Sequence, residues 1–402
     1  MTDLAGIRIL VLDDEPVALV LMERMLANLG FANVRTFDLG ERALAWLTGS
    51  GQAVDLVVLD LNMPGMDGVE FLRNLVELNF AGGVILASGE DEPIQQAAET
   101  LIQAHRITAL GHLHKPVQPE ALTALIEQWR VRVRSSRRGV ARSYASEDVA
   151  RAIANREFVN HYQPVVAVAT GAVVGVETLV RWQHPADGMV YPDRFIGVAE
   201  EHGHIDGLTQ VVLEGAIAQA RSWLNAGLRL RVSVNVSMDN LTALAFPDVL
   251  ARQVASAELS ASDIVLEITE SRLMPGLVTV LDVLTRLRLK RFRLSIDDFG
   301  TGHSSLAQLR DIPFDQLKVD RGFVHGAAGN EKKRAICDAS LRLARQLGIE
   351  VVAEGVEDAD DWQFLRQKGC DYAQGYFIAR PMPGPELLSW IDRWSARVLG
   401  GL

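Results

Sequence analysis

The sequence predicts an α/β protein with two domains: a doubly wound parallel sheet of five βα units, followed by a (β/α)8 barrel. Its 402 residues are too many for one ordinary core and suit two or three domains. Short apolar runs alternate with helical patterns along most of the chain, which is typical of parallel sheets. An arginine-rich segment near residues 130–146 interrupts this alternation and indicates the border between the two domains.

Composition narrows the class of protein. Hydrophobic residues make up 48% and charged residues 23%, as in soluble globular proteins. No apolar stretch approaches the length of a membrane span, and the N-terminus lacks a basic leader, so we expect no membrane insertion and no secretory signal. Two cysteines suit a reducing cytoplasm. A net charge of −11 argues against nucleic-acid binding but is compatible with a small phosphorylated ligand held by metal ions.

The first domain begins with a buried parallel strand at residues 7–13, where apolar and β-branched residues are continuous. A helical pattern follows and stops at Gly30. Residues 55–60 form a second buried run, which leads into the turn LNMPGMDG. Runs at 84–90 and 110–116 are further strand-and-loop units, so the functional site is expected at the carboxyl ends of these strands.

Polar side chains stand at those ends. Asp13, Asp14 and Asp60 end the first and third strands, and Ser88 and Lys115 follow later strands. Three acids, a hydroxyl and a lysine can form a phosphoryl-acceptor site that uses Mg²⁺. The metal would neutralise the acids, while the lysine pairs with the phosphoryl group and the serine donates a hydrogen bond to it.

The arginine-rich segment has no apolar period, and we place a basic, solvated linker at residues 131–148. The domains are then 1–130 and 149–402. The first linker residues are also compatible with an extension of the preceding helix, because an apolar stripe precedes them at Leu122, Leu125, Ile126 and Trp129.

The second domain contains repeated strand-like runs, and about 250 residues of this kind fit one TIM-like barrel. The runs are 173–182, 230–237, 263–270, 292–298, 314–320, 349–357 and 372–377.

In each run a residue of a functional type stands at or just past the carboxyl-terminal end of the apolar strand. These residues are Glu177, Asn235, Glu267, Asp297, Lys318, Glu354 and Gln374. In a barrel such ends converge on one face, where active sites lie. One strand-end acid alone is more often a helix cap or a surface ion pair, but capping does not explain a polar residue on every strand. Buried acids need counter-charge, and oxygen ligands suit Mg²⁺ or Mn²⁺. Two such ions could clamp a phosphodiester and activate water.

Residues 150–395 resemble the EAL-type phosphodiesterases, which convert cyclic di-GMP to 5′-pGpG. The signature is Glu177-Thr178-Leu179, with threonine in place of the usual alanine, inside GVETLVRW. The motifs NVS, EITE, DDFGTGHSSL, LKVD, AEGVE and AQGYFIARPM also match. The resemblance implies a metal-dependent hydrolase with two Mg²⁺ or Mn²⁺ ions in one site.

The resemblance also implies a role for each matched residue. The metal ligands would be Glu177, Asn235, Glu267, Asp297, Asp298 and Glu354, with Asp297 between the two ions. The catalytic group would comprise Lys318, which contacts the activated water, with Glu354, Glu177 and Gln374. Substrate would be bound by Arg181, whose fork suits a phosphate, and by Gln163, Leu179 and Gln374. Glu270 would anchor the DDFGTG loop with Glu357 as a partner, and His303 stands where tyrosine is usual.

Residues 5–130 resemble a response-regulator receiver domain through VLDDE, LDLNMPGMDG, ASGE and HKP. The resemblance implies that Asp60 is the phosphoacceptor. The side chains of Asp14 and Asp60 and the backbone carbonyl of Asn62 would hold Mg²⁺. The switch set would be Asp13, Ser88, His112 and Lys115, with His112 at a position that usually carries tyrosine or phenylalanine. A cognate sensor histidine kinase is the implied phosphodonor.

Together these features predict phosphorylation-regulated hydrolysis of cyclic di-GMP in bacterial two-component signalling, by a cytoplasmic homo-oligomer, a dimer or larger. One alternative is a catalytically silent cyclic di-GMP receptor that acts through protein partners. Another is a phosphorylation-gated interaction module without a nucleotide. The metal ligand set favours the enzyme, because inactive relatives usually lose it.

Overall fold

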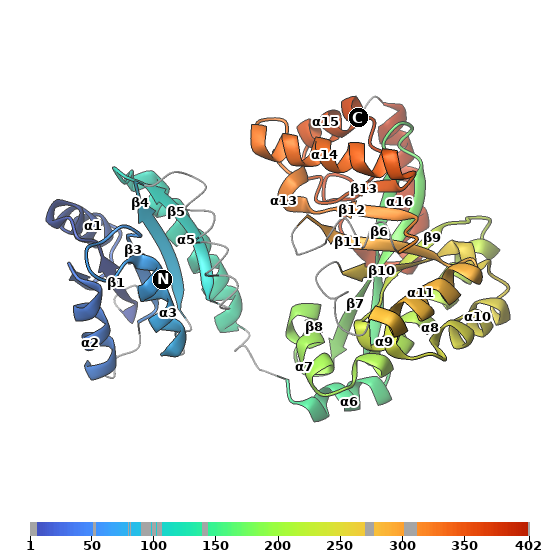
Figure 1. Ribbon diagram of the computed structural model, residues 1–402, viewed down its shortest axis with the longest axis horizontal. Helices are drawn as coiled ribbons and strands as arrows, with labels where there is room; N and C mark the ends of the chain where they lie inside the picture. The colour runs from blue at the N-terminus through green and yellow to red at the C-terminus, as the bar shows by residue number, and fades with distance from the viewer. Residues whose placement is uncertain are drawn as a thin grey trace. The chain divides into compact units, whose positions relative to one another are not determined.

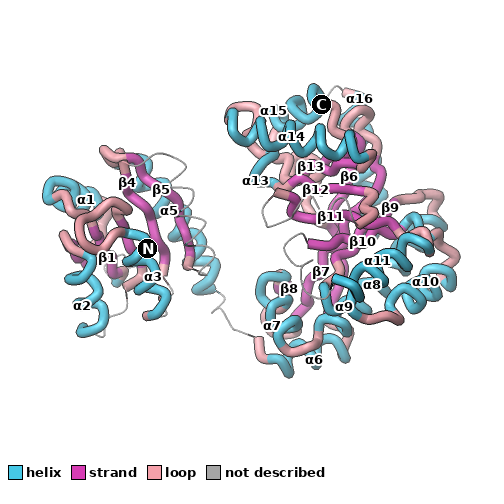
Figure 2. The backbone as a smooth tube through the Cα atoms, viewed as in Figure 1, coloured by secondary structure: helices cyan, strands magenta, loops and turns pink. Residues whose placement is uncertain are grey.

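The chain folds into two units, and the border in sequence lies between Arg142 and Ser143. The computed structural model describes residues 6–50, 54–78, 80, 82–89, 98, 102, 107–138, 144–269, 277–300 and 312–400. Both units combine helices with parallel strands (Figures 1 and 2). No helix within these ranges has the length and apolar character needed to cross a membrane.

The first unit is a parallel sheet with the strand order β2-β1-β3-β4-β5. Its elements are β1 (Arg8–Leu12), α1 (Pro16–Asn28), β2 (Asn33–Phe37), α2 (Gly40–Ser50), β3 (Leu56–Leu59), α3 (Gly68–Glu77), β4 (Gly83–Ser88), β5 (Thr108–His114) and α5 (Pro119–Arg138). The helix α5 continues into the segment predicted as a linker, as the alternative for its first residues expected.

Side chains of the central strand β1 alternate between two cores, because successive residues of a strand point to opposite faces. Leu10 lies in a core formed with α2 and α3, and Ile9 in a core formed with α1 and α5. Helices therefore cover both faces of the sheet, which confirms the predicted doubly wound fold.

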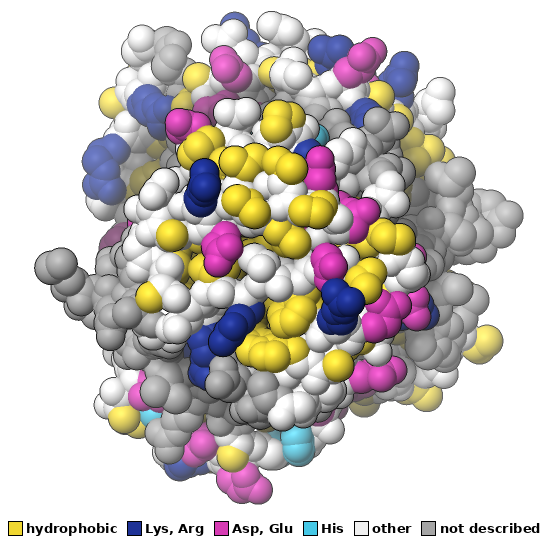
Figure 3. Space-filling view, turned by 90° about the vertical axis from the view of Figure 1, so that its left-hand side faces the viewer, with side chains coloured by type: hydrophobic (Ala, Val, Ile, Leu, Met, Phe, Trp, Pro, Cys, Tyr) yellow, Lys and Arg dark blue, Asp and Glu magenta, His cyan; other side chains and the backbone are white. Residues whose placement is uncertain are grey.

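The helix α1 leaves three apolar side chains exposed: Val17, Val20 and Leu21. Hydrophobic side chains also gather on the side of the molecule shown in Figure 3.

The second unit is the predicted barrel. Its strands are β6 (Phe158–Ala167), β7 (Val173–His184), β8 (Gly188–Val190), β9 (Arg231–Asn235), β10 (Ile264–Thr269), β11 (Arg293–Phe299), β12 (Gln316–Val319), β13 (Glu350–Ala353), β14 (Tyr372–Ala373) and β15 (Met382–Pro383). Its α-helices are α6 (Ser146–Ala154), α7 (Ile196–Glu201), α8 (Ile205–Asn225), α9 (Met238–Thr242), α10 (Phe246–Ser256), α11 (Leu277–Leu289), α13 (Arg321–Val324), α14 (Glu331–Leu347), α15 (Ala359–Lys368) and α16 (Leu387–Leu399). Short 3₁₀ turns are η2 (Pro192–Arg194), η3 (Ala261–Asp263) and η5 (Gly384–Glu386).

The strand β6 runs antiparallel to both of its neighbours in the closed barrel, and the short strand β8 pairs antiparallel with β7. The strands from β7 through β9 to β14 pair in parallel, whereas β6 pairs antiparallel with both β7 and β14 and so closes the barrel. The connection from β6 to β7 spans only residues 168–172, which suffices for a hairpin but is too short for the crossover that a parallel pair needs. The strand β6 was not predicted from the sequence.

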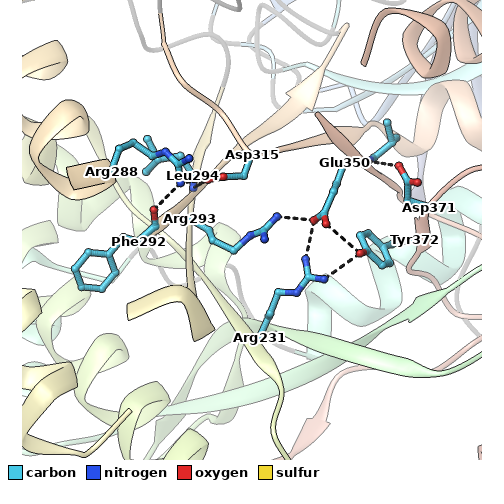
Figure 4. Close-up of polar contacts among 10 residues, drawn as sticks. Arg231, Arg288, Phe292, Arg293, Leu294, Asp315, Glu350, Asp371 and Tyr372 are labelled. Atoms are coloured by element: carbon cyan, nitrogen blue, oxygen red, sulfur yellow. Dashed lines mark hydrogen bonds and ion pairs between the residues drawn. The ribbon is translucent and has the colours of Figure 1, made fainter. Parts of the chain in front are cut away.

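An ion-pair network joins strands at the amino-terminal end of the barrel (Figure 4). Glu350 accepts hydrogen bonds from Arg231 at 2.7 Å and Arg293 at 2.5 Å. The hydroxyl of Tyr372 accepts a hydrogen bond from Arg231 at 2.9 Å and donates one to Glu350 at 3.2 Å. Four different strands are thereby tied together at this end, and the opposite, carboxyl-terminal end is where a barrel places its active site.

Candidate active site

Lys318 lies at the centre of a carboxylate cluster at the carboxyl-terminal end of the barrel. Its Nζ is 2.6 Å from Glu354, 3.0 Å from Glu267, 3.2 Å from Asp297 and 3.6 Å from Glu177. The lysine side chain is only 2% exposed. Burial alone would lower the pKa of Lys318, but the surrounding carboxylates outweigh it and raise this pKa well above its ordinary value. The lysine is therefore expected to be protonated at neutral pH.

One ammonium does not neutralise this cluster. Burial raises the pKa of Glu267 well above its usual range, against the attraction of Lys318. Burial likewise raises the pKa of Glu354 to about 8. Burial, followed by repulsion from Asp297, raises the pKa of Asp298 to about 6. Deprotonating all of these acids is costly unless further positive charge enters the site. The site is therefore suited to cations.

The register of the strands brings the acids together. Glu267 on β10 stands opposite Asn235 on β9, and Thr269 stands opposite Asp297 on β11. The side-chain amide of Asn235 donates a hydrogen bond to Glu177 at 3.2 Å. Polar residues at the ends of successive strands thus converge on one point.

Gln374 fixes the other oxygen of Glu177. Its Nε2 donates to Glu177 Oε2 at 2.6 Å and lies 3.1 Å from Oε1 of Gln163. Gln163 in turn donates to the backbone oxygen of Ala379 at 3.0 Å. The amides of Asn235 and Gln374 therefore orient both oxygens of Glu177.

Asp297 and Asp298 both face the cluster although they are adjacent on β11. Successive strand residues normally point to opposite faces. Here the pairing of β11 with β12 is irregular between Ile296 and Phe299, and Asp298 adopts a left-handed backbone with φ of 57°. An oxygen of each aspartate and one of Glu354 all lie within 4.8 Å of one another. This set of hard oxygen donors fits a divalent cation such as Mg²⁺ or Mn²⁺.

Two cavities border this end of the barrel. The larger, about 410 Å³, is mainly apolar and touches Leu179 and Asn235 but none of the clustered acids. The smaller, about 220 Å³, is lined by Gln163, Glu177, Leu179, Asp297, Arg321, Glu354, Gly355, Glu357, Gln374, Gly375 and Tyr376. Because the smaller cavity contains three of the carboxylates around Lys318, it is the better candidate for the reaction centre.

Arg181 lies on β7, four residues after Glu177, and is not among the residues that line the two cavities. It is 7% exposed, and burial lowers its pKa, although it remains a strong base. Its guanidinium lies over the ring of Tyr191 at 5.0 Å and donates to the backbone oxygen of Val180 at 2.8 Å. Three residues near the site were not predicted from the sequence: Tyr191, Tyr376 and Arg321. Tyr376 lies within a recognised motif, but no local pattern marks Tyr191.

Of the two predicted loop anchors, Glu357 belongs to the part of the chain that the structure describes. Glu270 lies outside the described residues, as does His303. The carboxylate of Glu357 pairs with Arg321 at 3.0 Å, and its backbone N–H donates to the buried Asp361 at 3.0 Å. The role of Glu357 toward the DDFGTG loop stays a prediction.

The first unit gathers its predicted acceptor residues. Lys115 lies 2.8 Å from Asp13 and 2.5 Å from Asp60. Oxygens of Asp13, Asp14 and Asp60 lie within 4.8 Å of one another, so they could hold a cation. Burial raises the pKa of Asp13 despite its hydrogen bond to Lys115. Burial would lower the pKa of Lys115, but both aspartates raise it.

Other parts of this site surround Asp60. The backbone N–H of Asn62 donates to Asp60 at 3.2 Å. Ser88 is buried at the end of β4, and His112 is partly buried on β5. Gly68 must be small, since a Cβ there would lie 2.4 Å from the backbone oxygen of Asp60.

Comparison with known proteins assigns each of the two units to a family. A model of the response regulator receiver domain matches residues 9–127, and a model of the EAL domain matches residues 146–381. This chain therefore belongs to the EAL-domain proteins that carry an N-terminal receiver domain, which confirms both predicted resemblances.

Several individual proteins are similar to this chain in sequence or structure. Cyclic di-GMP phosphodiesterase RocR of Pseudomonas aeruginosa is 34% identical over 386 residues, which cover 96% of this chain and 98% of RocR. Cyclic di-GMP phosphodiesterase NbdA of the same organism is 43% identical over 238 residues, covering 59% of this chain and 30% of NbdA. The solved structure of the PaMucR phosphodiesterase in complex with c-di-GMP has a TM-score of 0.57 and 38% identity, and the match covers 60% of this chain and 98% of that one.

Proposed function

We propose that this chain hydrolyses cyclic di-GMP to 5′-pGpG with two bound Mg²⁺ or Mn²⁺ ions, under the control of phosphorylation at Asp60. The observation that supports it best is the single buried ammonium of Lys318 among four carboxylates. A purely structural network would be expected to balance its charges, whereas a surplus of buried acids favours metal binding. The full-length similarity to RocR supports the choice of substrate.

The acids of the cluster and Asn235 are the proposed ligands of two metal ions. One ion would be held by Glu177, Asn235, Glu267 and Asp297, and the other by Asp297, Asp298 and Glu354. When bound, such ions lower the pKa of water and stabilise the negative charge that builds up on a phosphodiester. Hydrolysis adds water across one phosphodiester linkage: a P–O bond to the attacking oxygen forms and the P–O bond to the ribose 3′ oxygen breaks. The released 3′ oxygen takes up the proton that the water loses.

The chain's own side chains orient this step. Lys318 remains protonated, so its ammonium can donate a hydrogen bond to the attacking water. The positive charge of the ammonium also favours the deprotonated form of this water. Arg181 offers a planar fork to a phosphate oxygen. Gln163, Leu179 and Gln374 line the smaller cavity and would position the substrate there.

The receiver unit supplies the proposed control. Asp60 would accept a phosphoryl group from a sensor histidine kinase, with Mg²⁺ held by Asp14, Asp60 and the carbonyl of Asn62. Lys115 already contacts Asp60 and would pair with the phosphoryl oxygens. The exposed apolar residues of α1 begin soon after Asp14 in the chain and suit contact with a protein partner. We also propose a homo-oligomeric assembly.

One experiment separates the three functional hypotheses. The purified full chain is incubated with cyclic di-GMP and Mg²⁺ or Mn²⁺, with and without a chelator, and the products are separated by chromatography. Metal-dependent appearance of 5′-pGpG is expected. Binding in calorimetry without product would instead favour the silent receptor, and the absence of binding would favour a module without a nucleotide role.

A further inference from the structure

Tyr144 is the first described residue after the arginine-rich segment, and it is firmly attached to the barrel. It is 4% exposed, and its ring centroid lies 4.4 Å from that of Trp182. Its hydroxyl donates a hydrogen bond to Asp187 at 2.9 Å. The next polar side chain, Ser146, lies 2.8 Å from His204 at the start of α8. The end of the linker is therefore fixed on the hairpin formed by β7 and β8.

The same hairpin carries part of the proposed substrate site. Glu177, Leu179 and Arg181 lie on β7 at alternate positions, and Trp182 directly follows Arg181. Alternate residues of a strand share a face, so the tryptophan packs on the side opposite to the arginine. Trp182 is fully buried. A displacement of its ring would move the β7 backbone next to Arg181, because a close-packed core leaves the ring little space to move alone.

A second contact leads from Tyr144 to Arg181. The guanidinium of Arg194 lies 5.9 Å from the centroid of the Tyr144 ring. Arg194 ends η2, and its backbone N–H donates to the backbone oxygen of Tyr191 at 3.1 Å. Tyr191 in turn provides the ring that lies 5.0 Å from the Arg181 guanidinium. The linker end thus contacts both segments that hold this arginine.

A simpler explanation is that Tyr144 only fills the core between α6 and the barrel. Its burial alone is consistent with that role, since it belongs to the main apolar cluster of the barrel. Packing does not require the hydroxyl bond to Asp187, whose side chain is 38% exposed on the hairpin turn. The two explanations differ in what they predict for substrate affinity.

We propose that Tyr144 is a positioning residue that couples the interdomain linker to Arg181 and thereby adjusts the affinity of the site for its phosphodiester substrate. This inference rests on the proposed function. The helix α5 ends at Arg138, so residues 139–143 are all that separate the receiver unit's last helix from Tyr144. On this proposal, a change in the receiver unit displaces Tyr144, the first described residue after that helix. Arg181 then moves because both of its supporting segments touch the tyrosine.

The test uses the full-length protein and compares Tyr144→Phe, Tyr144→Leu and Asp187→Asn with the wild type. The values of kcat and KM for cyclic di-GMP are measured at saturating Mg²⁺, with and without beryllofluoride. Tyr144→Leu should raise KM about 5-fold or more, the low end of typical coupling between sites, and should abolish the effect of beryllofluoride on KM. Tyr144→Phe and Asp187→Asn should shift KM in the same direction by less, and kcat should stay within about 2-fold in all three variants.

Tyr372→Phe is the matched control, because it also removes a hydroxyl bonded to charged side chains but lies at the opposite end of the barrel (Figure 4). It should retain the wild-type KM and beryllofluoride response. Folding is checked by circular dichroism and thermal unfolding. Folded variants with a lower melting temperature but unchanged KM would overturn the proposal and leave Tyr144 a packing residue.

Failure of the positioning role of Tyr144 can be distinguished from failure of the proposed function. If the wild type does not hydrolyse cyclic di-GMP, the proposed activity fails. The affinity for cyclic di-GMP is then measured by calorimetry in Ca²⁺ for the wild type and Tyr144→Leu. Weaker binding by the variant supports the positioning role, and equal affinity, or no binding by either protein, overturns it.

Discussion

The Nζ of Lys318 lies 2.6 Å from Oε1 of Glu354, and the lysine side chain is almost entirely shielded from solvent. Both residues lie at the carboxyl-terminal ends of neighbouring parallel strands, β12 and β13, and the same ammonium also contacts Glu267. One ammonium thus forms ion pairs with several carboxylates. The charge that remains unbalanced explains why the site should respond to both pH and metal ions, and it motivates the first two predictions.

Stability of the metal-free protein should fall as pH rises from about 6 to 8. Burial raises the pKa of Asp298 from 3.8 to about 6 and that of Glu354 from 4.5 to about 8. The native state holds more protons than the unfolded chain between the unfolded and folded pKa of each group, so Asp298 lowers the free energy of unfolding as pH rises from about 4 to 6. Glu354 lowers it from about 4.5 to 8 and therefore accounts for the fall between pH 6 and 8. Lys318 stays protonated in both states here and does not contribute. Thermal unfolding with a chelator should show a melting temperature several degrees lower at pH 8 than at pH 6.

Mg²⁺ should reverse this trend, because metal ligands must be deprotonated and binding releases their protons. The rise in melting temperature on adding Mg²⁺ should be larger at pH 8 than at pH 6. Calorimetry in buffers of different ionisation enthalpy should detect proton release near pH 7. A metal-induced stabilisation independent of pH would contradict the assignment of Glu354 and Asp298 as ligands.

Glu177→Ala should abolish most activity. The variant removes the carboxylate that Asn235 and Gln374 orient, and with it one ligand of the proposed metal site. We expect turnover to fall by at least about 10³-fold, as when a central electrostatic stabiliser is lost. Glu258→Ala, which removes an exposed carboxylate paired with Arg221, is the control and should keep normal rates. Hydrolysis at the wild-type rate by Glu177→Ala would refute the metal assignment.

Activity should depend on the size of the metal ion. Mg²⁺ and Mn²⁺ suit a compact set of carboxylate and amide oxygens, whereas Ca²⁺ takes longer bonds and more ligands. Rates measured after removal of all metal and addition of one ion at a time should be high with Mg²⁺ or Mn²⁺ and low with Ca²⁺, which should still bind. Equal rates with Ca²⁺ and Mg²⁺ would argue against a geometrically strict site.

Phosphorylation of Asp60 should change the phosphodiesterase rate. The modification replaces the Asp60 carboxylate with an acyl phosphate that carries about −1.5 to −2 charge next to Lys115, which already lies 2.5 Å from the Asp60 carboxylate. A change of roughly 5- to 150-fold is expected from typical coupling free energies, with activation as the predicted direction. Rates are compared with and without beryllofluoride in the wild type and in Asp60→Asn. Four equal rates would show that the receiver does not control catalysis.

Much of this molecule follows from local features of the sequence. Apolar runs that alternate with helical patterns predict both α/β folds, because strand and helix periods are properties of short segments. The residues at the strand ends, such as Glu267 and Lys318, could be assigned to one site because parallel strands of a barrel present their carboxyl ends on one face. The receiver set around Asp60 followed from the same rule for an open sheet.

Other features depend on contacts between distant segments, and only the tertiary structure decided them. The antiparallel strand β6 closes the barrel by pairing with β14, far along the chain, and no local pattern marks this pairing. The left-handed backbone of Asp298 follows from the irregular pairing of β11 with β12. The contacts of Tyr144 with Trp182, and of Tyr191 with Arg181, arise from packing of separate elements. Sequence periodicity assigns a side chain to a face, but its partner across the fold depends on how all the elements pack together.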